Sequence, residues 1–333
     1  MNPQDKKYEI VREILEIPNI IKNFHTENLS KPLSSMRKTK KLFLVGEGSS
    51  RIFPAKNAIN FSLSNKIPLT IYTEGCRQAA ELNLKDYTLF GASNSGKTKE
   101  VLDLFKNRKS KSCFLLTENL ETTIKEHCDS IYILNCGKER AVAASKSVIE
   151  EALFYQNLLS KYTTKNISKK ELSNLSKKAK AVLTKEIDPG IIKKIAKAKI
   201  IYFSGRNNGV AEEAVLKANE IVRKKSIYLE GTYFVHGVEE VMKKNEVIIL
   251  IDPFKQEEEK IKEVLVNGIG INVIAISSRQ TIFPTIKIPK MNNFDTYLQL
   301  LACWNLLIES GKKLKINLDK PKRARKIGNE ISN

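Results

Sequence analysis

The sequence predicts an α/β protein made of two copies of one domain, each with a parallel sheet flanked by helices. Apolar strand candidates alternate with helical patterns along the chain, which is typical of βαβ units. The residue numbers of Gly46 and Gly205, two glycines at strand ends, differ by 159, and those of Ser93 and Asp252 differ by the same 159. A chain of 333 residues can bury two cores of ordinary domain size. Repetition at a fixed offset indicates a duplicated domain.

The apolar periodicity places each element in order. A helix is expected over residues 8–24. Five strands of the first half are expected over 42–45, 68–72, 88–91, 112–116 and 130–134. Helices over 142–160 and 169–185 connect the halves. The second half is expected to have strands over 200–203, 226–229, 247–251 and 273–276, an edge strand over 286–288 and a helix over 294–307. The basic residues 312–326 are expected to form an irregular tail.

The composition excludes several classes of protein. A net charge of +20 and a pI near 9.6 are typical of proteins that bind a phosphate backbone. However, the lysines are interleaved with glutamates, as in residues 255–260. The sequence also lacks the stacking aromatics of an RNA-binding sheet and the spacing of helix-turn-helix or zinc-finger motifs. We therefore expect a small anionic metabolite as the partner, and no nucleic acid.

Three signals absent from the sequence, a membrane-spanning segment, a signal peptide and a paired-cysteine motif, bear on its location and cofactors. No segment is apolar over the length needed to cross a bilayer, and residues 1–7 lack the apolar core of a signal peptide. We expect a cytoplasmic protein with no membrane contact. The five cysteines include no C-x-x-C pair, which fits reduced thiols and no zinc site. We expect neither a metal nor a cofactor.

Residues 93–98, Ser-Asn-Ser-Gly-Lys-Thr, are suited to hold a phosphate. They lie between an apolar strand and an amphipathic helix, whose first N–H groups and positive dipole end favour an anion. The hydroxyl groups can donate hydrogen bonds, and Gly96 permits close approach of the backbone. The same residue types also cap ordinary helices, so this segment alone leaves both interpretations open. In the second copy Asp252 stands in place of Ser93 and would repel a phosphate, so we expect only one half to bind the anion.

Two interpretations also stay open for the helix expected over residues 211–222. Its apolar stripe consists of Ala211, Val215, Ala218 and Val222. Glu213, Lys217 and Glu220 share the opposite face. That face is either a solvated surface with a Glu–Lys pair or the wall of a cleft, where a carboxylate and an ammonium could move protons beside a carbonyl. His236, one of three histidines, is likewise either structural or catalytic.

Six segments carry a resemblance to a known family. They are Gly48–Ser50, Ser93–Thr98, Glu139 with Val142–Lys146, Glu213–Glu220, His236-Gly237 and Asp319–Lys326. In their order and spacing they resemble tandem sugar-isomerase (SIS) domain proteins. The chain is most similar to the isomerase half of glucosamine-6-phosphate synthase, to stand-alone amino-sugar-6-phosphate deaminases/isomerases and to fructosamine-6-phosphate deglycases. The resemblance covers nearly the whole chain and implies two tandem SIS domains, each a five-stranded parallel sheet between helices in three layers.

The resemblance implies a role for each matching residue. The 6-phosphate would be held by Ser93, Asn94, Ser95 and Thr98, and the sugar hydroxyls by Ser49, Ser50 and the backbone near Val142 and Ala144. Glu220 would move a proton between C1 and C2 through an enediol-type intermediate, and Lys217 would lie close to the path of that proton. His236 would help to open the sugar ring from across a dimer interface. Lys326 would be an active-site lysine, which makes the basic tail a lid.

The chain also departs from the family pattern. Ala144 stands where a hydroxyl residue is usual, Val238 replaces a common proline, and Lys322-Arg323 replaces Arg-Asn. These departures bear on the identity of the sugar. The resemblance implies four regions, namely an N-terminal helical segment (1–30), a phosphate-binding SIS domain (31–165), a SIS domain with the catalytic Glu and His (166–317) and an active-site tail (318–333).

The leading functional hypothesis is a phosphosugar isomerase/deaminase that acts on a hexosamine or ketosamine 6-phosphate. The chain has no N-terminal cysteine and no glutaminase domain, so we expect it not to make ammonia from glutamine. A fructosamine-6-phosphate deglycase and a plain aldose–ketose phosphate isomerase are alternatives within the class. A non-catalytic sugar-phosphate sensor is the alternative from another class, although the presence of Glu220, His236 and Lys326 favours an enzyme. We expect a homodimer with shared active sites.

Overall fold

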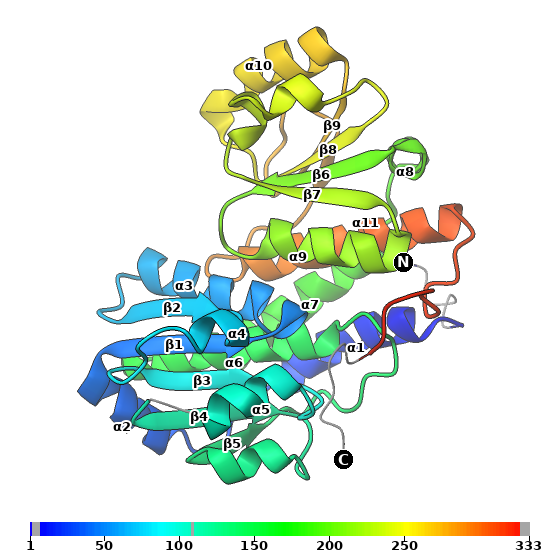
Figure 1. The fold of residues 1–333 in the computed structure, drawn as a ribbon. Helices are drawn as coiled ribbons and strands as arrows, with labels where there is room; N and C mark the ends of the chain where they lie inside the picture. The colour runs from blue at the N-terminus through cyan, green and yellow to red at the C-terminus, as the bar shows by residue number, and fades with distance from the viewer. Residues whose placement is uncertain (2–6, 108–109, 327–333) are drawn as a thin grey trace. The chain divides into compact units, whose positions relative to one another are not determined.

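The computed structural model describes residue 1, residues 7–107 and residues 110–326. These residues form two five-stranded sheets in which every strand pairing is parallel (Figure 1). The chain divides into two compact units. The N-terminal unit contains Glu16–Ser176 and the described residues from Ala324 to Lys326. The C-terminal unit contains Lys177–Arg323 and the described residues between Met1 and Leu15.

The sheet of the N-terminal unit has the strand order β2-β1-β3-β4-β5. Its strands are β1 (Lys41–Gly46), β2 (Thr70–Glu74), β3 (Thr88–Ala92), β4 (Ser112–Thr117) and β5 (Ser130–Ile133). The central strands are apolar at nearly every position because both faces of the sheet are covered. Helices α2 (Ser30–Thr39), α3 (Ile52–Ser64) and α6 (Lys146–Tyr162) contribute to the core on one face, and α4 (Cys76–Ala79) and α5 (Lys99–Lys106) contribute to the core on the other. This is the three-layer arrangement that the sequence predicts.

The sheet of the C-terminal unit repeats that order as β7-β6-β8-β9-β10. Its strands are β6 (Ile200–Gly205), β7 (Lys225–Glu230), β8 (Val247–Ile251), β9 (Asn272–Ser277) and β10 (Thr285–Lys287). Strands β6 and β8 begin and end 159 residues after β1 and β3, so the offset read from the sequence is confirmed at both ends of each strand. Figure 1 shows α9 (Val210–Lys217) and α11 (Asp295–Lys313) on one face of this sheet and α10 (Glu258–Ile261) on the other.

Helical segments are present at the expected ranges 8–24, 142–160, 169–185, 211–222 and 294–307, and further helices flank the strands. Their bounds are α1 (Glu9–Asn23), α2 (Ser30–Thr39), α3 (Ile52–Ser64), α4 (Cys76–Ala79), α5 (Lys99–Lys106), α6 (Lys146–Tyr162), α7 (Lys169–Thr184), α8 (Pro189–Lys197), α9 (Val210–Lys217), α10 (Glu258–Ile261) and α11 (Asp295–Lys313). The helix expected from residue 142 begins only at Lys146, and residues 142–145 form a loop instead. The first two residues of the expected irregular tail, Lys312 and Lys313, belong to α11 instead, since the apolar periodicity of that helix carries it further.

The charged face of α9 is not a solvated surface, so that interpretation is wrong. Helix α9 contacts β6 and β7 and also packs against α11. Both sides of the helix are therefore covered. Glu213 and Lys217 are fully buried, whereas Val215, expected in the buried stripe, is only half-buried. The last turn widens into a π-helical turn, η4 (Ala218–Val222), which carries Glu220.

Candidate functional site

The Ser93–Thr98 turn lies at the topological switch point of the N-terminal sheet. Strand β1 pairs with β2 on one side and with β3 on the other. The chain runs from β1 outward to β2 and then returns past β1 to form β3, so the direction in which strands are added reverses beside β1. The crevice at the carboxyl ends of strands flanking a switch point is the usual ligand position in open α/β sheets. Residues 93–98 directly follow β3, and Ser49 and Ser50 follow β1 in a short 3-10 turn, η2 (Gly48–Ser50).

Hydrogen bonds inside the turn bring its hydroxyl groups together. The Ser93 and Thr98 hydroxyl oxygens are 2.9 Å apart, and the Ser95 hydroxyl accepts a bond from the Lys97 N–H at 3.2 Å. Gly96 has φ +64°, and a Cβ added there would lie 2.6 Å from the Cβ of Thr122. This turn therefore requires glycine at position 96 on two grounds, backbone conformation and space.

The carbonyl groups of the turn are tied to neighbouring segments. The Asn94 carbonyl accepts from the Glu118 N–H at 3.0 Å, and the Ser95 carbonyl accepts from the Asn119 amide at 3.0 Å. In a planar trans peptide the following N–H points the opposite way. The N–H of Ser95 is thereby turned away from β4. A turn whose carbonyl oxygens are occupied elsewhere presents less negative potential to an incoming anion, which suits a phosphate cradle.

The loop before α6 adds a buried carboxylate to this unit. Val142 and Ala144 are half-buried in the loop. Glu139 is one of the residues that carry the family resemblance, which implied no role for it. Its side chain is fully buried. It accepts bonds from the Ser145 N–H at 2.8 Å and the Ser147 hydroxyl at 2.7 Å. The six-residue separation of Glu139 from Ser145 is no recognised capping motif, so these hydrogen bonds could not be predicted from the sequence.

Lys326 of the tail reaches the same carboxylate. Its Nζ lies 3.4 Å from Oε2 of Glu139, with the lysine side chain 31% exposed. Burial alone would raise the pKa of Glu139, but the Lys326 ammonium and the hydrogen bonds from Ser145 and Ser147 outweigh it and hold that pKa below its ordinary value. The N-terminal unit thus brings Lys326 next to the loop that contains Val142 and Ala144.

In the C-terminal unit, Glu213, Lys217 and Glu220 form a buried ion triad. The Lys217 Nζ lies 3.1 Å from Oε1 of Glu213 and 2.9 Å from Oε2 of Glu220. Glu213 and Lys217 are inaccessible to solvent, and the Glu220 side chain is 22% exposed. Burial would lower the pKa of Lys217, but the two carboxylates outweigh it and raise that pKa, so Lys217 remains an ammonium. Of the two carboxylates, only that of Glu220 is partly accessible to solvent.

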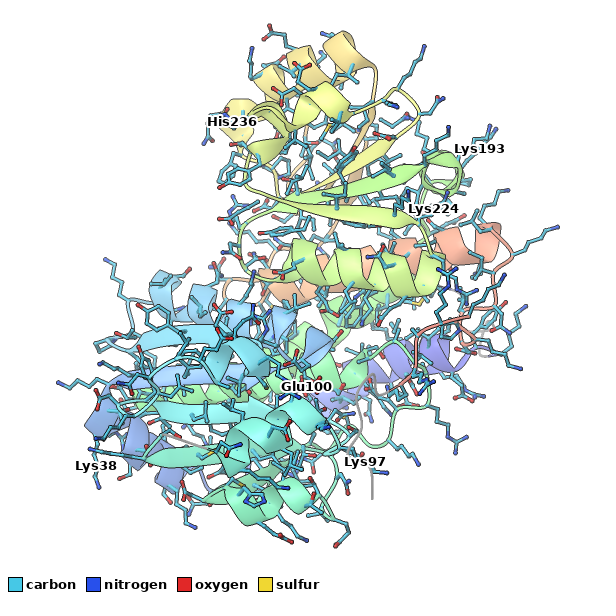
Figure 2. The ribbon with its side chains drawn as sticks, in the orientation of Figure 1. Lys38, Lys97, Glu100, Lys193, Lys224 and His236 are labelled. Carbon is cyan, nitrogen blue, oxygen red and sulfur yellow. The ribbon has the colours of Figure 1, made fainter. Side chains whose placement is uncertain are left out.

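His236 is exposed and follows a short 3-10 turn, η5 (Tyr233–Val235), in the C-terminal unit. Figure 2 shows it at the outer edge of that unit. An imidazole in this position is open to a second molecule. Its expected role across a dimer interface stays a prediction.

Where β8 ends, the C-terminal unit has an ion pair in place of a hydroxyl turn. Asp252 and Arg206 are joined by a 3.1 Å contact, and the Arg206 guanidinium lies over the Phe254 ring at 4.4 Å from its centre. The Ser277 hydroxyl donates to the second Asp252 oxygen at 3.2 Å. The carboxylate at the position equivalent to Ser93 is thus satisfied internally.

No cluster of three or more His, Cys, Asp or Glu side chains could hold a metal ion among the residues described. No helix there is long and apolar enough to cross a membrane.

No protein-family model and no curated protein sequence matches the chain significantly. Solved structures do match. Tagatose-6-phosphate ketose/aldose isomerase from Escherichia coli is 14% identical with a TM-score of 0.78, covering 97% of this chain and 98% of that one. The C-terminal domain of glucosamine-fructose-6-phosphate aminotransferase from Francisella tularensis is 18% identical with a TM-score of 0.76, covering 96% and 100%. Glucosamine-6-phosphate deaminase from Thermotoga maritima is 21% identical with a TM-score of 0.74, covering 96% and 99%.

These matches establish the fold. The chain has the tandem SIS fold of phosphosugar isomerases over nearly its whole length, as the sequence resemblance implies. At sequence identities of 14–21%, a shared fold does not establish that two proteins act on the same substrate.

Proposed function

We propose that this protein is a phosphosugar isomerase/deaminase that acts on a hexosamine or ketosamine 6-phosphate. The N-terminal unit would hold the phosphate through Ser93, Asn94, Ser95 and Thr98, and the sugar hydroxyls through Ser49, Ser50 and the backbone near Val142 and Ala144. The C-terminal unit would supply the proton-transfer carboxylate. The structural neighbours include an isomerase and a deaminase of phosphosugars, which supports this class of reaction.

The observation that carries the proposal is the Glu213–Lys217–Glu220 triad. Burying an ion triad costs desolvation energy that a packed apolar replacement would avoid, so it is poorly explained by stability alone. Only Glu220 keeps an accessible edge, and it sits on a π-helical turn, a distortion frequent at functional sites. A sugar-phosphate sensor would need a binding turn but no such carboxylate.

The proposed chemistry moves one proton and then, for an amino sugar, releases the amine. His236 would assist ring opening. Glu220, as the carboxylate, would take the proton from C2 of the open-chain aldose and return it to C1. From a hexosamine the product is the C2 imine of the ketose phosphate, and water hydrolyses this imine to the ketose phosphate and ammonia. A ketosamine would transfer its proton in the opposite direction, from C1 to C2, and the resulting C1 imine would be hydrolysed to the aldose phosphate and the amine. Lys217, which contacts Glu220 at 2.9 Å, would lie close to the path of the proton, and Lys326 would lie beside the reacting end of the sugar.

The test is proton exchange at C1 and C2 in deuterated water, measured by NMR over a panel of hexose, hexosamine and fructosamine 6-phosphates. We expect exchange with at least one of them, and ammonia release if it is an amino sugar. Glu220→Gln should leave binding near normal and lower turnover by about 10²–10⁴, the usual contribution of a positioned general base.

Glu263→Gln is the matched control, because Glu263 also pairs with a lysine three residues away, at 3.1 Å, but on an exposed surface. It should retain full activity. If the wild-type protein binds phosphosugars and exchanges no proton on any of them, the sensor function replaces the enzyme.

A further inference from the structure

The buried carboxylate of Glu139 joins three segments of the N-terminal unit. Its Oε1 accepts bonds from the backbone N–H groups of Ser145 at 2.8 Å and Ser147 at 3.3 Å, at the start of α6. Its Oε2 accepts from the Ser147 hydroxyl at 2.7 Å. The same Oε2 also lies 3.4 Å from the Asn94 Nδ2 and 3.4 Å from the Lys326 Nζ. Asn94 belongs to the 93–98 turn, and Lys326 to the tail.

This contact determines which way the Asn94 amide faces. An ionised carboxylate has no proton to donate, so the group that meets Glu139 must be the amide NH₂. The ion pair with Lys326 and the donors of Ser145 and Ser147 keep Glu139 ionised, with its pKa below the ordinary value. The amide oxygen of Asn94 is thereby fixed as an acceptor on the other side. That oxygen is buried and has no hydrogen-bond partner among the residues described.

A fixed acceptor is poorly matched to a phosphate group. Phosphate oxygens accept hydrogen bonds, and so does the Asn94 Oδ1. A sugar hydroxyl or amino group, in contrast, can donate to it. A buried acceptor without a partner is costly to keep, and satisfying it would favour the ligand that brings a donor.

We propose that Glu139 is a positioning residue that orients Asn94 so that the Asn94 side-chain oxygen accepts a hydrogen bond from a hydroxyl or amino group of the sugar, and not from the phosphate. The same carboxylate holds Lys326 beside this contact. The inference rests on the proposed sugar-phosphate function. It assigns the Asn94 side chain to the sugar. The part of Asn94 in holding the phosphate is then confined to its backbone, which Asn94→Ala retains, beside the hydroxyls of the turn.

The experiment compares calorimetric affinities of three variants for inorganic phosphate, glucose 6-phosphate and glucosamine 6-phosphate. Asn94→Ala should weaken sugar-phosphate binding by about tenfold, the loss expected for one hydrogen bond, and leave inorganic phosphate binding within about twofold. Ser95→Ala is the matched control in the same turn and should weaken all three ligands. A loss confined to the amino sugar identifies the donor as the amine, and a loss for both sugars identifies a hydroxyl.

Glu139→Gln tests the positioning role, because glutamine can offer its own NH₂ to Asn94 and release the fixed orientation. It should lower sugar affinity relative to inorganic phosphate, and it should add little to Asn94→Ala when the two are combined. A merely structural Glu139 would weaken every ligand alike and independently of Asn94.

The outcomes separate the two proposals. If the wild-type protein binds no phosphosugar, the proposed function itself is overturned. If the wild type binds them, and Asn94→Ala weakens inorganic phosphate as much as the sugar phosphates or changes no affinity at all, the inference about Asn94 is overturned while the function stands. The Asn94→Ala result decides this even if Glu139→Gln fails to fold.

Discussion

At the scale of single residues, each unit contains a buried charge that positions other side chains. Glu139 orders a turn, a loop and a tail, and Lys217 holds two glutamates. Each buried charge is compensated by partners at hydrogen-bond distance, which is the condition under which a protein interior tolerates it. Removing one partner should therefore have a far larger effect than removing a surface charge.

Lys217→Met tests whether removing one partner from the buried triad lowers stability more than removing a surface charge. It removes the ammonium and leaves the Glu213 carboxylate buried without its counter-ion, so we expect a loss of about 3–5 kcal/mol in the free energy of unfolding. Lys260→Met is the matched control, because Lys260 pairs with Glu263 on an exposed surface. It should change stability by less than about 1 kcal/mol. Urea unfolding measures both, and equal losses would show that the triad is not energetically distinct.

At the scale of elements, the sequence predicted the fold well because its signals are local. The apolar runs of parallel strands are buried on both faces, so they stand out without any tertiary knowledge, and the offset of 159 located β6 and β8 from β1 and β3. The extra turn of α11 and the late start of α6 are boundary differences of a few residues.

The burial of the charged face of α9 could not be predicted from the sequence. A helical wheel separates Glu213 and Lys217 from the apolar stripe, but it does not show that α11 covers the other side. The π-helical turn at Ala218–Val222 has no sequence signature either. In the same way, the Glu139 network depends on contacts with Asn94 and Lys326, which are far from it in the chain. Such non-local contacts decide the chemistry of the site.

Gly96→Ala tests the conformation of the 93–98 turn as an element. Gly96 and Gly137 both have φ near +70°, but an added Cβ would meet Thr122 at 2.6 Å from Gly96 and nothing within 4 Å of Gly137. Gly137→Ala should cost about 1–2 kcal/mol from backbone strain alone. Gly96→Ala should cost about 1–3 kcal/mol more from the clash and should also weaken phosphate binding. Equal effects of the two substitutions on stability and on phosphate affinity would mean that the turn adapts freely.

At the scale of the whole molecule, the two units share a topology and differ in chemistry. The Ser93 N–H donates a hydrogen bond to the Leu116 carbonyl at 3.0 Å, and in the second unit the Asp252 N–H donates the equivalent bond to the Ile276 carbonyl at 2.8 Å. Yet one position carries a hydroxyl and the other a carboxylate paired with Arg206. The two units thus share one scaffold, on which the N-terminal unit carries the Ser93–Thr98 turn and the C-terminal unit carries the ion triad. The proposed function needs both.

The last prediction concerns a second copy of the chain. We propose a symmetric homodimer in which His236, exposed in the single chain, serves the site of the partner. His236→Ala and Glu220→Gln proteins should each be inactive alone. In a mixed dimer one site would receive both intact residues if they come from different chains. About half of randomly mixed dimers are hybrids with one good site of two, so activity should approach roughly a quarter of the wild-type value. Co-expression with two affinity tags isolates the hybrid and gives about half of wild-type activity per dimer. An inactive hybrid of verified composition would show that each chain builds its own site, and His236 would then have to act within its own chain.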